Sequence, residues 1–349
     1  MTGRRAGDYD FELPADLIAQ DHAHPRDASR LLIMRGSELV DACFADLPEF
    51  LQSGDALVLN ETRVIPARLV GELASHTKIE ILLLHPARLP RYDGRASRWR
   101  ALVKPARRAR MNQEIYFGQV GSARVIGVQE NGMREIEFSL EVPFARFLEE
   151  WGQVPLPPYI RNDSRQARQD YQTVFARVPG SVAAPTAGLH FTAGLLERLS
   201  ARGVDILKIV LDVGLGTFRP MRTESLDDHV MHAESYAIPA ETAVALHRVK
   251  SEGRRVIAVG TTVVRALEGC ISECGELKAG PGITNLFITP GFRFRMVDAL
   301  ITNFHLPRST LLVLVSAFAG GARVVRAYRH AVTRRYRFFS FGDAMLIFP

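Results

Sequence analysis

The sequence has few cysteines and no long apolar stretch, and both shortages restrict the kind of protein it encodes. Only three cysteines occur among 349 residues, and so small and odd a number favours a reducing compartment over a disulfide framework. The longest apolar run covers residues 311–319, about half of the roughly 18 residues that a membrane span requires. The N-terminus carries two arginines with no apolar stretch after them, so we expect no secretion signal there. We expect a cytoplasmic protein that binds no membrane.

Several common catalytic motifs are also missing. The sequence contains no Walker A motif, no H-E-x-x-H motif and no G-x-S-x-G motif. Gly214 and Gly216 are followed by Arg219, where a dinucleotide-binding fingerprint requires glycine. Cys270 and Cys274 have no second Cys or His pair that would complete a zinc site. We expect no metal site, although a metal held by His229, His232 and Glu234 remains an alternative.

Positive charge is unevenly distributed along the chain. The net charge is +6, yet residues 88–110 contain nine basic side chains against one acid, and residues 323–337 contain six arginines and no acid. Aromatic residues accompany both runs, and clustered arginines with aromatics suit a polyanion such as structured RNA. The alternative is a solvated basic face without a partner.

The spacing of apolar residues predicts two architectures in one chain. Between residues 66 and about 141, six short segments alternate with period two, which indicates a small antiparallel β-barrel. Elsewhere strands alternate with helices, as in an α/β domain with a mixed sheet. We therefore expect residues 1–65 and 150–349 to form an α/β domain and residues 66–149 to form an inserted β-barrel.

Within the α/β domain the pattern predicts individual elements. Strands are expected at 31–34, 56–59, 204–211, 236–238 and 255–259, and helices at 193–201, 240–250, 263–268, 310–319 and 322–334. A hairpin is expected at 286–294 and a closing strand at 336–348.

The stretch from Ala184 to Thr192, A-P-T-A-G-L-H-F-T, is the strongest candidate for a site. Thr192 is a suitable N-cap for the helix that follows. His190 would then lie near the positive end of that helix, which keeps the imidazole neutral. Gly188 would let the backbone approach a ligand. The alternative is a buried turn with a structural histidine.

Other polar turns could share that ligand, because the carboxyl ends of parallel strands meet at one edge of a sheet. They are residues 214–218, with Gly214, Gly216 and Thr217, and residues 260–262, with Thr261 and Thr262. Arg265 could clamp a carboxylate or could form a structural salt bridge. His305 precedes another helix start and could equally pack or cap.

Nine motifs occur in order over nearly the whole chain: D-Y-D-F-E-L-P (8–14), N-E-T-R-V-I-P-A-R-L (60–69), A-L-V-K-P-A-R-R (101–108), A-P-T-A-G-L-H-F-T (184–192), V-G-L-G-T-F-R-P (213–220), D-D-H-V-M-H-A-E (227–234), G-T-T-V-V-R-A-L-E (260–268), I-T-N-F-H-L-P-R-S-T-L-L (301–312) and Y-R-F-F-S-F-G-D-A-M-L-I (336–347). Together they resemble the S-adenosylmethionine:tRNA ribosyltransferase-isomerase family of queuosine biosynthesis.

The resemblance implies a β-barrel inserted in an α/β domain. It also implies that the ribosyl part of S-adenosylmethionine moves onto 7-aminomethyl-7-deazaguanine at the wobble position of tRNA, giving epoxyqueuosine-tRNA, adenine and methionine. S-adenosylmethionine is then consumed as a ribosyl donor, no separate cofactor is needed, and the protein is expected to act as a monomer.

On this basis roles can be predicted for individual residues. The proton transfers are assigned to His190, with Asp228 and His229 as second candidates. Substrate binding is assigned to Arg63, Thr186, Gly188, Gly214, Gly216, Thr217, Thr261, Thr262, Arg265, Asn303 and His305. Contact with tRNA phosphates is assigned to Arg98, Arg100, Lys104, Arg107, Arg108 and Arg110.

Three positions depart from the family pattern. Asp212 stands where histidine is usual, and a carboxylate is a weaker base near neutrality. Thr289 and Phe341 stand where tyrosines are common. Two other readings remain: an RNA-binding protein without catalysis, and a metal hydrolase built on His229, His232 and Glu234.

Overall fold

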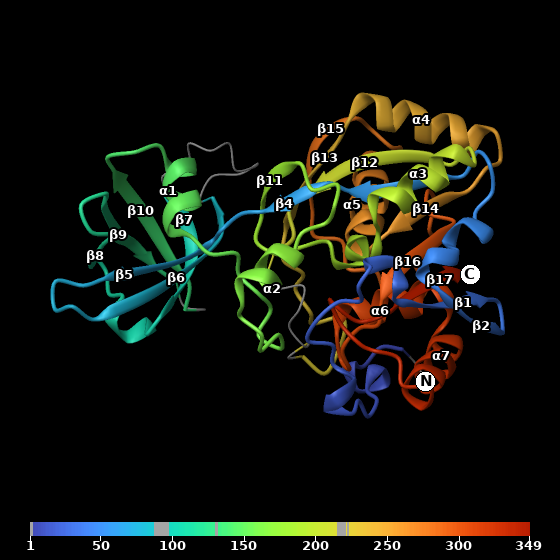
Figure 1. The fold of residues 1–349 in the computed structure, drawn as a ribbon, viewed down its shortest axis with the longest axis horizontal. Helices are drawn as coiled ribbons and strands as arrows, with labels where there is room; N and C mark the ends of the chain where they lie inside the picture. The colour runs from blue at the N-terminus through green and yellow to red at the C-terminus, as the bar shows by residue number, and fades with distance from the viewer. Residues whose placement is uncertain (1–2, 87–97, 130–131, 215–220, 222) are drawn as a thin grey trace.

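The computed structural model describes residues 3–86, 98–129, 132–214, 221 and 223–349. They form a β-barrel and a larger α/β body, which follow one another along the long axis of the molecule (Figure 1). The α/β body contains a mixed sheet and the barrel is closed and antiparallel. The fold class expected from the sequence is therefore confirmed.

The α/β body is organised around a nine-stranded sheet with the order β15-β13-β12-β3-β14-β16-β17-β1-β2. Neighbouring strands β12, β3, β14 and β16 are parallel, whereas the outer strands are mixed in direction. The strand bounds are Arg30–Arg35 (β1), Glu38–Cys43 (β2), Ala56–Asn60 (β3), Asp205–Leu211 (β12), Glu234–Ile238 (β13), Val256–Val259 (β14), Gly280–Thr284 (β15), Ala299–Asn303 (β16) and Ala344–Phe348 (β17).

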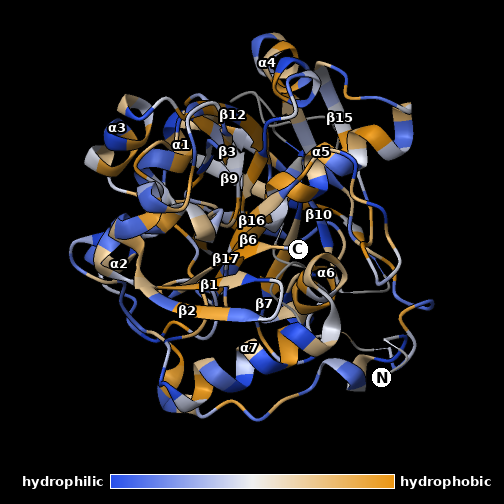
Figure 2. Cartoon of the chain, turned by 90° about the vertical axis from the view of Figure 1, so that its right-hand side faces the viewer, coloured by the Kyte–Doolittle hydropathy of each residue, from blue (hydrophilic) through white to orange (hydrophobic). Residues whose placement is uncertain are grey.

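Each central strand is buried on both sides, because its alternate side chains enter two different cores. In β3, Ala56 and Val58 join one core and Leu57 and Leu59 join the other. The first core is covered by α4 (Ala240–Ser251), α5 (Thr261–Cys274), α6 (Thr310–Ala319) and α7 (Gly321–Thr333), and the second by η4 (Phe44–Glu49) and α3 (Ala193–Ala201). Figure 2 shows hydrophobic residues concentrated in the central strands and hydrophilic residues on the outer helices. Burial on both faces explains why these strands are nearly continuous apolar runs.

Helices α6 and α7 follow one another with only Gly320 between them. In the part of the chain that the structure describes, no single helix is long and apolar enough to cross a membrane; α6 and α7 reach that length and apolarity only together, and a 115° bend separates them.

The barrel has the strand order β10-β7-β6-β5-β8-β9. Its strands are Arg68–Glu72 (β5), Lys78–Pro86 (β6), Arg98–Lys104 (β7), Glu114–Tyr116 (β8), Gly121–Val128 (β9) and Arg134–Leu140 (β10), and the 3-10 helix η5 (Ala106–Arg108) follows β7. Trp99, Phe117 and Phe138 fill the interior, and helix α1 (Phe144–Trp151) adds Phe144 and Phe147 to the same core. Aromatic rings thus supply much of the apolar area of this small core.

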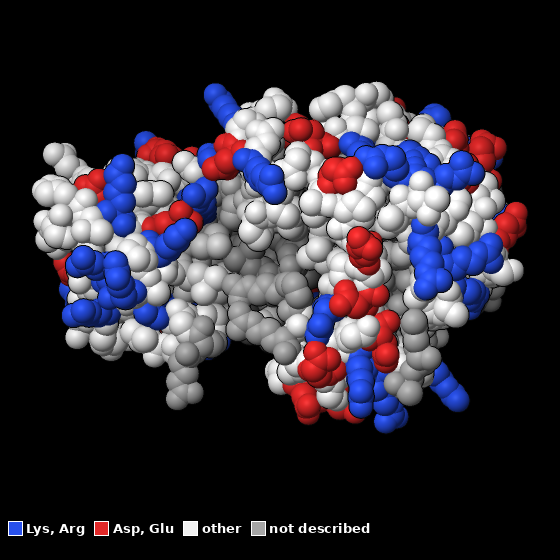
Figure 3. Space-filling view, turned by 90° about the horizontal axis from the view of Figure 1, so that it is seen from below, with Lys and Arg blue, Asp and Glu red and all other residues white. Residues whose placement is uncertain are grey.

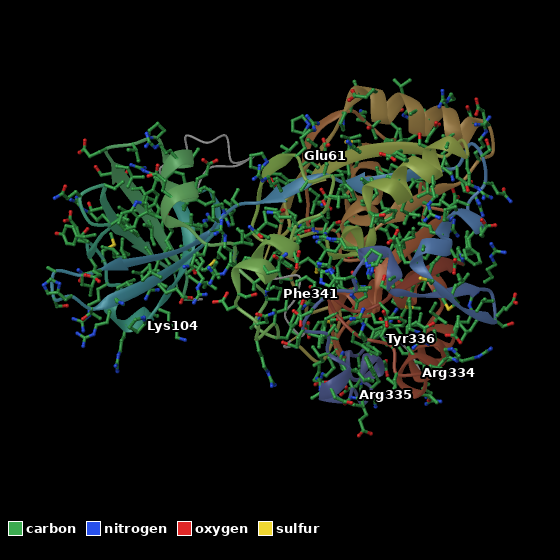
Figure 4. The ribbon with its side chains drawn as sticks, in the orientation of Figure 1. Glu61, Lys104, Arg334, Arg335, Tyr336 and Phe341 are labelled. Atoms are coloured by element: carbon green, nitrogen blue, oxygen red, sulfur yellow. The ribbon has the colours of Figure 1, made fainter. Side chains whose placement is uncertain are left out.

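The two bodies are joined by strands as well as by chain connections. Strand β4 (Thr62–Val64) pairs in parallel with β11 (Val178–Ser181) between them. Beside β4, buried Glu61 accepts hydrogen bonds from Arg177 at 2.5 and 3.0 Å, and Figure 4 labels Glu61 at this junction. Arg68 at the start of β5 reaches Asp163 at 3.2 Å. The remaining short elements are η1 (Ala6–Tyr9), η2 (Ala15–Leu17), η3 (Arg26–Ala28), α2 (Arg165–Asp170) and η6 (Thr186–His190).

Three element predictions are wrong in detail. Residues 286–294 do not form a hairpin but lie in the connection between β15 and β16, and β16, in the middle of the sheet, was not predicted. The closing strand begins only at Ala344, because the backbone turns at Phe339, where φ is 71°. Helix α5 extends from Thr261 to Cys274, well beyond the expected end. By contrast, α3 starts as expected, since the Thr192 hydroxyl accepts a hydrogen bond from the Leu195 N–H at 3.1 Å.

Candidate active site

The carboxyl ends of four parallel strands meet at one edge of the sheet. Asn60 ends β3, Asn303 ends β16, Gly260 follows β14, and Asp212 and Val213 follow β12. Ligands in open α/β sheets bind at this edge, because the loops that leave it diverge and leave a crevice. The 3-10 helix η6 packs against the end of β16 and forms a further wall.

Two adjoining hollows lie at this edge. They are partly open, so that their volumes of about 340 and 330 Å³ include open solvent, and both are lined by Thr186, Asn303, His305 and Leu311. The first is completed by Tyr159, Phe304, Leu306, Ser309, Phe339 and Ser340. The second is completed by Ala184, Pro185, Ala187, Val213, Gly260, Thr261, Thr262 and Thr302. Among the residues that the structure describes, the lining offers hydroxyl, amide and imidazole groups and contains no Lys, Arg, Asp or Glu.

The turn between β14 and α5 brings a helix N-terminus to the second hollow. Gly260 has a φ of 91°, which side-chain-bearing residues rarely adopt. It places Thr261 and Thr262 in the first turn of the 14-residue helix α5, where backbone N–H groups lack intrahelical acceptors. Asn60 reaches the Thr262 hydroxyl at 3.5 Å. This wall can therefore donate hydrogen bonds to polar atoms of a ligand.

Asn303 is the centre of the polar network beneath the hollows. Its Oδ1 accepts a hydrogen bond from the Thr186 hydroxyl at 2.9 Å, and its Nδ2 donates to the Phe339 carbonyl at 3.2 Å. Nδ2 also lies 3.0 Å from Nε2 of His190. Because a carbonyl can only accept, the Phe339 contact fixes which end of the amide faces His190.

His190 lies behind Asn303 and does not line either hollow. Since Nε2 accepts from Asn303, the ring hydrogen is on Nδ1, which lies 2.8 Å from the Ser29 hydroxyl. The ring stacks on Phe44 with centroids 5.0 Å apart. Burial lowers the pKa of His190 to about 3, and the charges of Arg337, His22 and Arg26 add to the effect. The ring is neutral, as expected, but both nitrogens are occupied and it does not reach the edge of the pocket.

His305 is the imidazole that the structure places at the hollows. Its Nε2 lies 2.9 Å from the Thr302 hydroxyl, and its backbone N–H donates to the Tyr328 hydroxyl at 2.9 Å. Within the described chain its Nδ1 has no hydrogen-bond partner. Burial lowers the pKa of His305 to about 3. A neutral ring with one nitrogen available can exchange a hydrogen bond with a ligand.

Arg265 forms the structural salt bridge that was the alternative to a substrate clamp. It pairs with Glu234, and both side chains are buried. Its Nε donates to the Leu286 carbonyl at 3.2 Å, while Nη2 has no partner among the described residues. Glu234 also accepts a hydrogen bond from the Gly214 N–H at 3.3 Å. The pair therefore holds the start of the loop after β12, and neither residue lines a hollow.

The sequence and structure of the chain were compared with known proteins. A family model described as queuosine biosynthesis protein matches residues 6–347. The S-adenosylmethionine:tRNA ribosyltransferase-isomerase of Symbiobacterium thermophilum is 53% identical over 98% of this chain and 99% of its own length, and that of Moorella thermoacetica is 52% identical with the same coverage. The crystal structure of the S-adenosylmethionine tRNA ribosyltransferase of Thermotoga maritima has a TM-score of 0.56 and 39% identity, over 97% of this chain and 99% of that one.

The chain belongs to the queuosine biosynthesis protein family. The resemblance inferred from the nine motifs is thus confirmed. Three motifs of this family member, A-P-T-A-G-L-H-F-T, G-T-T-V-V-R-A-L-E and I-T-N-F-H-L-P-R-S-T-L-L, supply most of the lining of the second hollow.

Three other expected ligand contacts, Gly188, Arg63 and Gly214, do not line the hollows. Gly188 packs closely, because an added Cβ would lie 2.8 Å from Phe175 and Thr173. Arg63 is exposed on β4, and Gly214 adjoins the second hollow through Val213 without lining it. Gly216 and Thr217 lie outside the described residues.

Asp228 and His229 lie in the loop before β13 and line neither hollow. Asp228 is exposed, and the His229 ring packs 5.1 Å from that of Phe287. Partial burial lowers the pKa of His229, and neighbouring His232 adds to the effect. Met221, near the start of this loop, donates its N–H to the Arg308 carbonyl at 2.9 Å, which ties the loop to the segment after His305.

Tyr159, Phe339 and Ser340 line the first hollow and were not predicted from the sequence. The Tyr159 hydroxyl lies 2.5 Å from the Ser340 hydroxyl, and its ring stacks on Phe339 at 4.5 Å. The run V-P-L-P-P-Y indicated only an extended segment. Phe341 packs edge-on against Tyr171.

The barrel of this family member presents an exposed basic loop. Lys104, Arg107, Arg108 and Arg110 are exposed around η5, and Figure 3 shows Lys and Arg side chains gathered on the barrel. Lys104 is labelled in Figure 4 on the barrel, far from Phe341 in the α/β body. Nearly buried Arg134 supports this loop by donating to the Ala109 and Ala106 carbonyls at 2.7 and 2.9 Å.

Two other residues that were predicted to contact tRNA have different surroundings from the residues of the basic loop. Arg98 pairs with Glu137 at 2.6 Å, and Arg100 is partly buried. Arg88, Arg91 and Arg95 of the basic run lie outside the described residues.

Proposed function

We propose that this protein transfers and isomerises the ribosyl part of S-adenosylmethionine onto 7-aminomethyl-7-deazaguanine at the wobble position of a tRNA. Epoxyqueuosine-tRNA, adenine and methionine are the products. Membership of the family supports the reaction, and one structural observation supports the site. Uncharged hydroxyl, amide and imidazole groups from separate strand ends converge on adjoining hollows that could receive a nucleoside.

Under this proposal the nucleoside of S-adenosylmethionine occupies the two hollows. The ribose and adenine are oriented by hydrogen bonds from Thr186, Thr261 and Thr262. The nucleoside is also bound by Asn303 and His305, which line both hollows. The positive charge of the sulfonium acidifies the 5′ carbon of the ribose, so that a base can remove a proton there. Adenine then leaves with the electron pair of the glycosidic bond and takes up a proton. The deprotonated aminomethyl nitrogen of the tRNA base forms a bond to a carbon of the ribosyl group, and methionine leaves with the electron pair of the bond between sulfur and the 5′ carbon.

We propose a positioning role for His190 in place of proton transfer. An imidazole whose pKa is about 3 is a weak base, and Asn303 stands between the ring and the hollows. Asp228 and His229 stay as the proposed proton-transfer residues, because their loop is tied to Arg308 near His305. Arg63 is retained as a candidate for the methionine carboxylate, since its exposed guanidinium has no ion-pair partner among the described residues.

The remaining parts of the proposal concern partners. The exposed residues of the basic loop, Lys104 to Arg110, contact tRNA phosphates. S-adenosylmethionine is consumed as a substrate, so the reaction requires no further cofactor. The protein acts as a monomer in the cytoplasm, where its tRNA substrate is found, and sedimentation equilibrium measures the monomeric state directly.

Adenine release decides between this function and the alternatives. Purified protein is mixed with S-adenosylmethionine and a tRNA that carries the aminomethyl base, and adenine is quantified by chromatography. We expect one adenine per modified tRNA, and none when the tRNA carries guanine at that position. Binding of tRNA without adenine release would instead identify a non-catalytic RNA-binding protein.

A further inference from the structure

A second cluster of chemically reactive side chains lies outside the hollows. His22 and His24, in the segment between η2 and η3, approach Asp170 at the end of α2. One potential ligand atom from each residue lies within 4.8 Å of the other two, and the two imidazole rings are 4.4 Å apart. The His22 ring lies 5.7 Å from that of Phe341, which Figure 4 labels.

His22 is the residue whose surroundings call for an explanation. Its side chain is only 8% exposed. Nδ1 lies 2.7 Å from the Ala23 carbonyl, and because a carbonyl only accepts, Nδ1 must carry the hydrogen. In the neutral ring Nε2 therefore presents a lone pair. That atom is buried and has no hydrogen-bond partner in the described chain, an arrangement that costs about 1–3 kcal/mol if nothing satisfies it.

The atom that Nε2 faces is also an acceptor. Nε2 lies 3.4 Å from Oδ1 of Asp170, which is also the separation of about 3.4 Å expected between two ligands of a tetrahedral zinc ion with bonds near 2.1 Å. The Nδ1 hydrogen bond to a backbone carbonyl is the contact that commonly orients a metal-binding histidine. His24 is exposed, so an ion can enter from solvent.

Other neighbours of Asp170 do not account for His22. Gln166 donates to Oδ1 of Asp170 at 3.0 Å, and the Arg26 guanidinium lies 3.8 Å from the same atom. Arg26 is mainly engaged by the backbone carbonyls of Gln172 and Asp170, at 2.6 and 3.1 Å. These contacts satisfy the carboxylate in part and leave Nε2 of His22 without a donor.

We propose that His22, His24 and Asp170 bind one divalent transition-metal ion, with Zn²⁺ as the preferred ion. Two imidazoles and one carboxylate form a ligand set that zinc accepts, and water completes the fourth position on the exposed side. The ion would cross-link the N-terminal segment to α2. That segment continues into Ser29, whose hydroxyl contacts His190, so the ion would stiffen the support of Asn303. This proposal replaces the expectation of no metal site and is independent of the proposed reaction.

The test is metal binding by the full-length protein. Chelator-treated protein is titrated with ZnCl₂ in a calorimeter, and with CoCl₂ while the visible absorption of tetrahedral cobalt is recorded. We expect one saturable site per chain. His22→Gln and His24→Gln should each weaken Zn²⁺ binding about hundredfold, because each removes one of three protein ligands. His24→Cys, which supplies another zinc ligand, should keep the site.

The matched control is His76→Gln, since His76 is an exposed histidine on the barrel, and this change should leave binding unaltered. His24 is also exposed, so His24→Gln is expected to fold, and thermal unfolding without metal verifies this. Zn²⁺ should raise the melting temperature of the wild type and not that of His24→Gln. Absence of a saturable site would overturn the proposal, and so would Zn²⁺ binding that persists in His24→Gln and is lost on replacing His229 and His232.

Discussion

The barrel carries positive charge on exposed loop residues, whereas the described residues that line the hollows of the α/β body are uncharged. Lys104, Arg107, Arg108 and Arg110 extend into solvent, where they act on phosphates over about 8–10 Å at physiological salt. The lining of the hollows instead offers short-range hydrogen bonds from residues such as Thr186 and Asn303. The exposed basic residues of the barrel are therefore suited to binding a polyanion, and the hollows of the α/β body are suited to recognising a small polar molecule. The two activities should therefore separate by mutation.

The largest effect is expected at Asn303. Asn303→Ala removes the group that joins Thr186, His190 and the Phe339 carbonyl. The specificity constant kcat/KM for S-adenosylmethionine, measured by adenine release, should fall about 10²- to 10³-fold. A loss of this size is typical when one preorganised polar group is removed from an active site. The dissociation constant for tRNA should not change.

Asn162→Ala provides the control for this prediction, because Asn162 is partly exposed and its amide donates to Asp21 at the surface at 2.9 Å, outside the residues that line the hollows. It should retain wild-type turnover. A folded Asn303→Ala protein with unimpaired adenine release would contradict the assignment of the pocket.

The next effect concerns the basic loop. Reversing two charges with Arg107→Glu and Arg108→Glu should weaken tRNA binding up to about hundredfold at low salt. The slope of log affinity against log salt should become shallower by about 1 for each phosphate that the loop no longer neutralises. Filter binding at several salt concentrations measures both quantities, while calorimetry should show unchanged S-adenosylmethionine binding.

The surface control reverses one charge with Arg202→Glu, since Arg202 is an exposed arginine that pairs with Glu49 beside the start of β12, at the opposite edge of the sheet. The comparison between barrel and pocket fails if this variant loses tRNA affinity to the same degree, or if the loop variant loses affinity for S-adenosylmethionine.

The smallest effect is a pH dependence of stability. Burial lowers the pKa of His190 and His305 from 6.5 to about 3, so between these values only the unfolded chain binds the protons. The contribution of the two neutral rings to the free energy of unfolding is therefore fully present above pH 6.5 and is lost as the pH falls below that value. At pH 5.5 each histidine should lower the free energy of unfolding by about 1.4 kcal/mol.

Urea unfolding between pH 5 and 8 measures this loss. His190→Gln should reduce the pH slope by close to one proton, while the exposed histidine variant His76→Gln should not alter it. An unfolding free energy that stays constant between pH 7 and 5.5 would show that the two rings are not buried as neutral groups.

Elements with a regular local pattern could be predicted well from the sequence. The barrel strands alternate with period two, and α3 has its cap at Thr192, so the residues that define each element are neighbours in the chain. Strand β16 was missed, because Ala299–Asn303 is short and buried on both faces and shows no alternation. The length of α5 was underestimated, since buried polar residues such as Glu268 interrupt its apolar pattern.

The candidate site was predicted in part. The threonines of two turns and the pair Asn303 and His305 do meet at the hollows, as expected from strand ends that share one edge. His190 could not be placed correctly, because its distance from the hollows depends on Asn303, 113 residues away. For the same reason, the sequence could not decide whether Arg265 binds a substrate carboxylate or pairs with Glu234, as it does in the structure. Tyr159 reaches the pocket only through contacts with Phe339 and Ser340.

The sequence alone determined the family, the barrel strands, most helices of the α/β body and the uneven distribution of charge, because these properties depend on neighbouring residues and on motifs in a given order. Only the tertiary structure decided which side chains share a cavity, which ring is buried behind an amide, and that His22 and His24 lie against Asp170. These contacts form only when the sheet and its loops pack together in the folded protein. Packing then joins groups more than a hundred residues apart and excludes water from them, and no local pattern encodes either distance or burial.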